Sequence, residues 1–107
     1  MRGFDFNTLM RQVRKMQEEA NKKKEELAET VRVEGKAADG LVTATANGVR
    51  QLVSLKIDPK AIDTSDLSML EDLIIAAVNQ ALAEAKTREE AEMGKLTGGI
   101  KIPGLTM

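Results

Sequence analysis

Hydrophobic and polar residues alternate along residues 31–57, which is the pattern of half-buried strands. Two turn dipeptides, Asp39-Gly40 and Asn47-Gly48, interrupt the alternation. Both suit a two-residue type I′ turn, because both central residues of that turn need a positive φ. The pattern therefore predicts a three-stranded antiparallel meander.

Two-residue loops also predict how the strands pair. Ala37 would lie opposite Val42 in the first hairpin, and Val42 opposite Val53 in the second. Both registers place the apolar residues on one face, and Leu41 and Leu52 become exceptions on the polar face. Small residues at the centre of the apolar face predict that a helix packs closely there. That face carries Val31, Val33, Gly35, Ala37, Val42, Ala44, Ala46, Val49, Val53, Leu55 and Ile57, with Gln51 as its polar member.

A long helix is predicted before the sheet, from Asn7 to about Thr30, with Asn7 or Thr8 as its N-cap. Lys23 occupies a register position where the stripe would have another apolar residue. At 1.5 Å per residue this helix is about 33 Å long, more than a small sheet can cover. We expect part of it to project or to pack against another subunit. Its apolar stripe consists of Leu9, Val13, Met16, Ala20 and Leu27.

A second helix is predicted from near Ser65, with a capping box at residues 68–71 and Asp66 as an alternative cap. Its apolar stripe fades after Ala85, and Gly94 or the pair Gly98-Gly99 would end it. The order is α-β-β-β-α, an α+β fold in one domain over residues 1–107. Segments 1–6 and 97–107 are candidates for flexible ends.

Composition narrows the possible chemistry. The chain has 107 residues, no cysteine and no histidine, so it lacks thiolate ligands and the commonest general base. No apolar run approaches the roughly 20 residues of a membrane span, and the start lacks a secretory signal. We therefore expect a cytoplasmic protein that does not contact membranes.

No catalytic constellation is evident. We find no nucleophile–base pair, no phosphate-binding glycine loop and no cofactor fingerprint. A cluster of carboxylates suggests a magnesium site, but strand ends and helix N-termini explain these residues better. We expect no enzyme activity, cofactor, metal or small-molecule substrate. The carboxylates are Asp58, Asp63, Asp66, Glu71 and Asp72.

Charge is distributed unevenly although the net charge is −1. Residues 1–24 carry a net +4 and the remainder −5. This asymmetry fits either a basic interaction end or a solvated helix whose charges pair at i,i+4. On the first helix, Arg11, Lys15 and Lys22 share one face and Arg14 lies beside it. Only two aromatic residues are present, which disfavours stacking on single strands and leaves duplex phosphates as the nucleic-acid target.

Short motifs along nearly the whole chain resemble the YbaB/EbfC family of bacterial nucleoid-associated proteins. This resemblance implies a tweezer-shaped α+β homodimer, located in the cytoplasm at the nucleoid, that binds double-stranded DNA with modest sequence preference at most. The motifs are Leu9-Met10-Arg11-Gln12, Met16-Gln17-Glu18-Glu19, Gly40-Leu41-Val42, Asn47-Gly48, Ile57-Asp58-Pro59, residues 69–74 with 76–81, Leu96-Thr97-Gly98-Gly99 and Ile102-Pro103-Gly104-Leu105.

In that family, DNA contacts are attributed to the first and last helices. Carried onto this chain by charge and face, the candidate DNA-binding residues are Arg11, Arg14, Lys15, Lys22, Lys86 and Arg88. The alternative hypothesis is a protein-interaction scaffold that binds a partner through the helical arms and the segment from Ile100 to Leu105.

Overall fold

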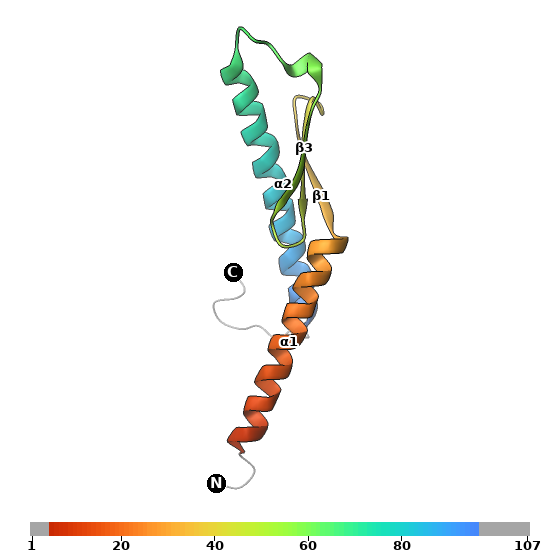
Figure 1. Ribbon diagram of the computed structural model, residues 1–107, viewed down its shortest axis with the longest axis vertical. Coiled ribbons are helices and arrows are strands. Elements are labelled where there is room, and N and C mark those ends of the chain that lie inside the picture. The colour runs from red at the N-terminus through yellow and green to blue at the C-terminus, as the bar shows by residue number, and fades with distance from the viewer. Residues whose placement is uncertain (1–4, 97–107) are drawn as a thin grey trace.

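A computed structural model describes residues 5–96 of the protein and confirms the α-β-β-β-α order. The molecule is elongated, with principal extents of 74 × 25 × 18 Å. Figure 1 shows the first helix extending well away from the sheet, as its length predicts. The elements are α1 (Phe6–Thr30), β1 (Arg32–Ala37), β2 (Val42–Asn47), β3 (Leu52–Ile57), the 3-10 helix η1 (Pro59–Ala61) and α2 (Leu67–Leu96).

The three strands form an antiparallel sheet in sequence order, so β2 is central and β1 and β3 are its edges. The first hairpin has the predicted register, with Ala37 paired to Val42. Asp39 and Gly40 have the positive φ values that the predicted type I′ turn requires, 56° and 92°, but Ala38 before them is also left-handed, with a φ of 52°. The meander and its first register are therefore confirmed.

The predicted register of the second hairpin is wrong. Val42 pairs with Ile57 rather than with Val53, a shift of four residues. The shift is even, so Ile57 stays on the face that the alternation assigned to it. A β-bulge then interrupts the pairing, and Leu52 lies opposite Ala46. Since paired residues share a face, the bulge moves Leu52 from the predicted polar face to the apolar one.

The side chain of Asn47 explains the longer turn. Its Oδ1 accepts hydrogen bonds from the backbone N–H groups of Val49 and Gln51, both at 3.0 Å, and its Nδ2 donates to Gln51 Oε1 at 2.9 Å. The positive φ lies at Arg50, with a value of 62°, instead of at the Asn-Gly pair. The connection is therefore a three-residue loop, residues 48–50, with a left-handed third residue.

Helix α2 lies along the sheet (Figure 1) and packs against the apolar face of β1 and β2. The contact is made by a row of alanines, Ala77, Ala81 and Ala85, all fully buried. Gly35 of β1 lies directly beneath this row. A Cβ added to Gly35 would collide with the backbone carbonyl oxygen of Ala77 and the backbone nitrogen of Ala81. Gln80 Oε1 accepts a hydrogen bond of 2.6 Å from the backbone N–H of Lys36, next to Gly35. The prediction of a closely packed helix is confirmed.

Strand β3 lies largely outside this cover. Three of its apolar side chains are exposed, Leu52 to 46%, Val53 to 44% and Leu55 to 38%, whereas Ile57 is partly buried against the core. We call these three residues the β3 face. A soluble chain normally protects an apolar edge strand, so this face indicates an interaction surface.

The N-cap of α1 lies earlier than predicted. Asp5 caps the helix, because its carboxylate accepts hydrogen bonds from the Asn7 backbone N–H and the Thr8 hydroxyl, both at 2.9 Å. The prediction of Asn7 or Thr8 is therefore wrong. A carboxylate at this position also interacts favourably with the positive end of the helix dipole.

The ends of α2 correct two further predictions. Asp66 Oδ1 accepts the backbone N–H of Met69 at 3.1 Å, so the alternative cap is confirmed and Ser68 lies inside the helix. The helix continues through Gly94 to Leu96, so Gly94 does not end it. The other predicted terminator, Gly98-Gly99, lies outside the described residues. Within residues 5–96, no helix is both long and apolar enough to cross a membrane.

Candidate nucleic-acid interface

The arm formed by α1 is attached to the body at its C-terminal end. Leu27 is the buried residue of this helix, with 1% of its surface exposed, and Val31 is buried just beyond it. The Leu27 carbonyl oxygen accepts the backbone N–H of Gly48 at 3.0 Å. A Cβ at Gly48 would lie within 3.0 Å of Leu27 and Val31, so glycine allows the β2–β3 loop to meet the helix.

The basic face of α1 lies on the opposite side from this attachment. Four of the predicted DNA-binding residues, Arg11, Arg14, Lys15 and Lys22, are on α1, and all four are exposed. With 3.6 residues per turn, they lie on the far side of the helix axis from Leu27. We call these four residues the basic face.

The charges of the basic face are not paired within the described residues 5–96. Arg14 and Lys15 each have a glutamate four residues ahead, Glu18 and Glu19, but neither pair comes within 4.0 Å. The i,i+4 pairing that the charge pattern allowed is therefore not formed there. These cations are free to contact an external anion.

The two candidates on α2 do not lie together. Lys86 and Arg88 are about 160° apart around the helix axis, so they occupy opposite sides of α2. Both are exposed, and Arg88 Nε lies 3.7 Å from Glu92 Oε1. Arg88 thus belongs to a cluster between the two helices, whereas Lys86 is separate from it.

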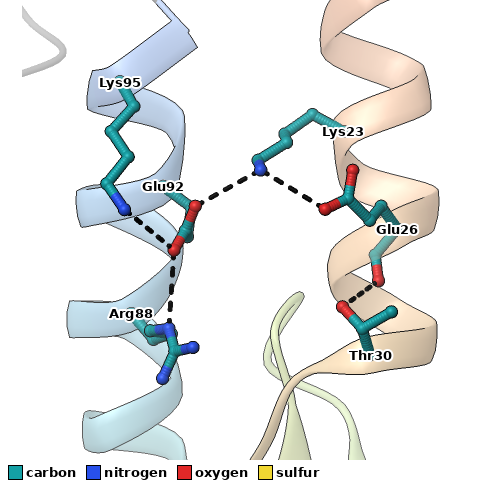
Figure 2. Close-up of polar contacts among 6 residues, drawn as sticks. All are labelled: Lys23, Glu26, Thr30, Arg88, Glu92 and Lys95. Carbon is teal, nitrogen blue, oxygen red and sulfur yellow. Dashed lines mark hydrogen bonds and ion pairs between the residues drawn. The ribbon is translucent and has the colours of Figure 1, made fainter.

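This cluster, which we call the junction, joins α1 to α2 through Lys23 and Glu92. Lys23 Nζ lies 3.3 Å from Glu92 Oε2 and 3.5 Å from Glu26 Oε1. Lys95 Nζ lies 3.3 Å from Glu92 Oε1, so three cations surround one carboxylate (Figure 2). The pKa of Glu92 is lowered, chiefly by the hydrogen bond from Lys23 and to a smaller extent by that from Lys95. The same bond to Glu92 is the main reason that the pKa of Lys23 is raised.

Sequence reasoning did not list Lys23 and Lys95 among the site residues. The sequence did contain a signal for Lys23, because this lysine interrupts the apolar stripe of α1 at a position that faces the body.

Arg50 was missed too, and no sequence signal marked it. It has Nε 3.0 Å from Glu89 Oε1 and connects the β2–β3 loop to α2. Two carboxylates of the acidic run at residues 89–92 are therefore neutralised by ion pairs.

The other carboxylates of interest have structural roles. Asp58 Oδ1 accepts the backbone N–H of Lys60 at 2.9 Å and caps η1. Asp63 accepts hydrogen bonds from the backbone N–H and the hydroxyl of Ser65. The hydroxyl bond, with the backbone bond, lowers the pKa of Asp63. In the part of the chain that the structure describes, no group of three acidic side chains is arranged to hold a metal ion.

Comparison with known proteins identifies the family. The model of the YbaB/EbfC DNA-binding family matches residues 1–100. The chain belongs to this family. The YbaB/EbfC match includes both helices and the whole sheet, so it covers the arm, the junction and the β3 face together.

Curated relatives are similar to this chain over nearly their full length. A nucleoid-associated protein of Myxococcus xanthus is 51% identical over 99% of this chain and 100% of its own. Another from Caldanaerobacter subterraneus subsp. tengcongensis is 48% identical over 96% of this chain and 92% of its own. The crystal structure of an uncharacterized protein from Helicobacter pylori has a TM-score of 0.76 at 21% identity. It covers 89% of this chain and 99% of its own, and shows that the fold is shared.

Proposed function

We propose that the protein is a nucleoid-associated protein that binds double-stranded DNA as a homodimer with little sequence specificity. The observation that carries this proposal is the basic face of α1, four exposed cations without an ion-pair partner among residues 5–96. Binding of such cations to DNA phosphates releases counterions, which is the main source of non-specific affinity. Membership of a DNA-binding family supports the same conclusion.

Low sequence specificity follows from the kind of contact proposed. Phosphate contacts position a protein on the duplex but carry no base information. The basic face consists of two arginines and two lysines on one surface of α1. Lys86 and Arg88 occupy opposite sides of α2, so at most one of them would add a contact from the second helix. The chain contains two phenylalanines and no other aromatic residue, so it has few side chains on which exposed bases could stack.

The homodimer is supported by the β3 face. A second copy of this chain would cover the exposed Leu52, Val53 and Leu55. It would also pair the outer edge of β3, beside which no strand lies among the described residues. The core of the single chain is built largely of alanines, so it buries little apolar volume per residue. A twofold dimer would carry two arms and present the basic face twice.

The decisive experiment is fluorescence anisotropy of two unrelated duplexes titrated with the protein at several salt concentrations. We expect both duplexes to bind, with log affinity falling linearly in log salt. Reversing Arg11 and Lys15 to Glu should weaken binding to both duplexes and reduce the salt slope by about two for each arm in contact, or about four for a dimer bound through both arms. The matched control reverses Lys36 and Lys60, which are exposed and lie outside both α1 and β3, and should keep the wild-type slope.

Two results would count against the proposal. No binding of either duplex at low salt would contradict the DNA-binding function itself. Equal loss in the arm variant and in the control variant would show that the basic face is not the binding surface, and that only net charge matters. Circular dichroism of each variant would establish that its helices are retained.

A second candidate function is favoured by the apolar stripe of the same arm. Leu9 and Met16 are exposed, and Val13 between them is partly exposed. Such a stripe is suited to binding a helix of a partner protein. This scaffold hypothesis predicts a partner retained after nuclease treatment and lost in the variant Leu9→Glu/Met16→Glu, with no DNA binding at low salt. Its other proposed contact, Ile100 to Leu105, lies outside the described residues.

A further inference from the structure

The α1 arm is held firmly at one end only. Its buried contact is Leu27, whose carbonyl oxygen is hydrogen-bonded to the Gly48 backbone N–H at 3.0 Å. Between residues 5 and 22, every residue is exposed or partly exposed. A helix of 25 residues attached through its last turns is free to change its angle unless a further contact prevents it.

Lys23 supplies such a contact, one turn before Leu27. It is the α1 residue whose ion pair reaches α2 in the described chain, through Glu92 at 3.3 Å (Figure 2). The base of the arm has a separate connection, since Arg50 in the β2–β3 loop pairs with Glu89 of α2 at 3.0 Å. Loss of the Lys23 contact would therefore free the arm without freeing the loop to which it is attached.

Glu92 is placed so that Lys23 can leave at low cost. Only 16% of its side chain is exposed, and a carboxylate this enclosed is unfavourable without a counter-charge. Arg88 and Lys95 lie four residues before and three residues after Glu92 on the same helix. They remain beside the carboxylate whether or not the arm is in place. Glu92 thus stays compensated after Lys23 moves away.

We propose that the Lys23–Glu92 ion pair is an electrostatic latch that fixes the angle between α1 and α2 at low ionic strength and opens as ionic strength rises. Salt weakens the attraction within this partly exposed pair, in which Lys23 keeps 24% of its side chain exposed, whereas the apolar contact of Leu27 has no charge to screen. The junction therefore has one contact that responds to salt and one that does not. This inference concerns the geometry of the arm, and it stands whether or not the protein binds DNA.

The latch is tested by single-molecule FRET within one chain. The protein has no cysteine, so Gln12→Cys on α1 and Asn79→Cys on α2 give two unique labelling sites, both exposed and neutral. Labelled chains are diluted into excess unlabelled protein, so that distances between copies do not contribute. Salt is raised from about 0.01 M to about 1 M, which shortens the Debye length from about 30 Å to about 3 Å.

We expect one narrow distance distribution at low salt that broadens as salt is raised. Glu92→Gln should give a broad distribution at every salt concentration. Lys23→Gln, which removes the other charge of the ion pair, should give the same result. The control is Glu90→Gln, which removes the same charge from an exposed position two residues away and should match the wild type. A narrow distribution that persists in both junction variants, or one lost equally in the control, would overturn the latch.

Discussion

The missing side chain at Gly35 allows the backbones of β1 and α2 to meet. Its Cα lies beneath Ala77 and Ala81, where a methyl group would collide with main-chain atoms rather than with a flexible side chain. Main-chain atoms of a regular helix cannot swing aside individually, so any added atom must displace the whole helix. This one position controls how closely the two layers of the fold approach.

Gly35→Ala is therefore expected to lower the free energy of unfolding by about 1–3 kcal/mol, the usual cost of overpacking a core. The measurement is the midpoint of urea unfolding at fixed protein concentration. Gly94→Ala is the matched control. Its added methyl group meets no atom of residues 5–96 within 4 Å outside its own helix, and alanine favours the helix by up to about 1 kcal/mol. If Gly35→Ala were as stable as the wild type, the close approach at this position would be contradicted.

Among the elements, α1 depends on the protonation of its N-cap. Hydrogen bonds from the Thr8 hydroxyl and the Asn7 backbone N–H lower the pKa of Asp5. Because the carboxyl pKa is lower in the folded chain than in the unfolded one, the cap contributes fully above the unfolded value. Its contribution is lost as the pH falls through the folded value.

We accordingly expect the first turn of α1 to be intact at neutral pH and to fray as the pH drops below about 4, the ordinary range of an aspartate. Backbone NMR chemical shifts of residues 6–9, followed during a pH titration, would report this fraying of the first turn. In Asp5→Asn, the amide oxygen still caps the helix but does not titrate, so these shifts should lose their pH dependence. The same titration curve in that variant would mean that another group is responsible.

The hairpins show how much of the fold follows from local pattern. Alternation and turn dipeptides predicted the meander and the pairing of Ala37 with Val42. They failed at the second turn because the side chain of Asn47 bonds to the loop backbone and Gly48 is needed against Leu27. Asn-Gly there serves a contact with α1, a helix distant in sequence, which no local rule includes.

The candidate site was predictable to a similar degree. Charge and helical periodicity located the basic face, because both are properties of one helix. The junction was not predicted, since Lys23, Arg88 and Lys95 meet at Glu92 only after the chain folds back on itself. Lys86 and Arg88 were grouped by proximity in sequence, and the geometry of α2 separates them.

At the scale of the whole molecule, the β3 face leaves the single chain with an unsatisfied apolar edge. We expect light scattering at micromolar concentration to give about twice the chain mass of 11.7 kDa. Val53→Lys and Leu55→Lys, each of which puts a charge on this face, should shift the mass toward that of the monomer. Met16→Lys adds the same charge at a residue that is 58% exposed on the arm, away from this face, and should leave the dimer intact.

A monomer mass for the wild type would remove the dimer from the proposed function and leave each chain with a single basic face. A dimer that persists in both β3 variants would place the interface elsewhere. Either result leaves the latch between Lys23 and Glu92 unaffected, since both partners belong to one chain.

The alanine row of α2 has a further consequence for how the helix finds its place. Ala77, Ala81 and Ala85 repeat every four residues, so a slide of four residues, about 6 Å, would present another alanine to Gly35. Packing alone would therefore allow several axial positions of α2 that fit against Gly35 almost equally well. The polar contacts select among them: a slipped helix would carry Gln80 away from the Lys36 backbone N–H and Glu89 away from Arg50. The alanine row brings α2 close to the sheet, and a few polar side chains determine the axial position of the helix.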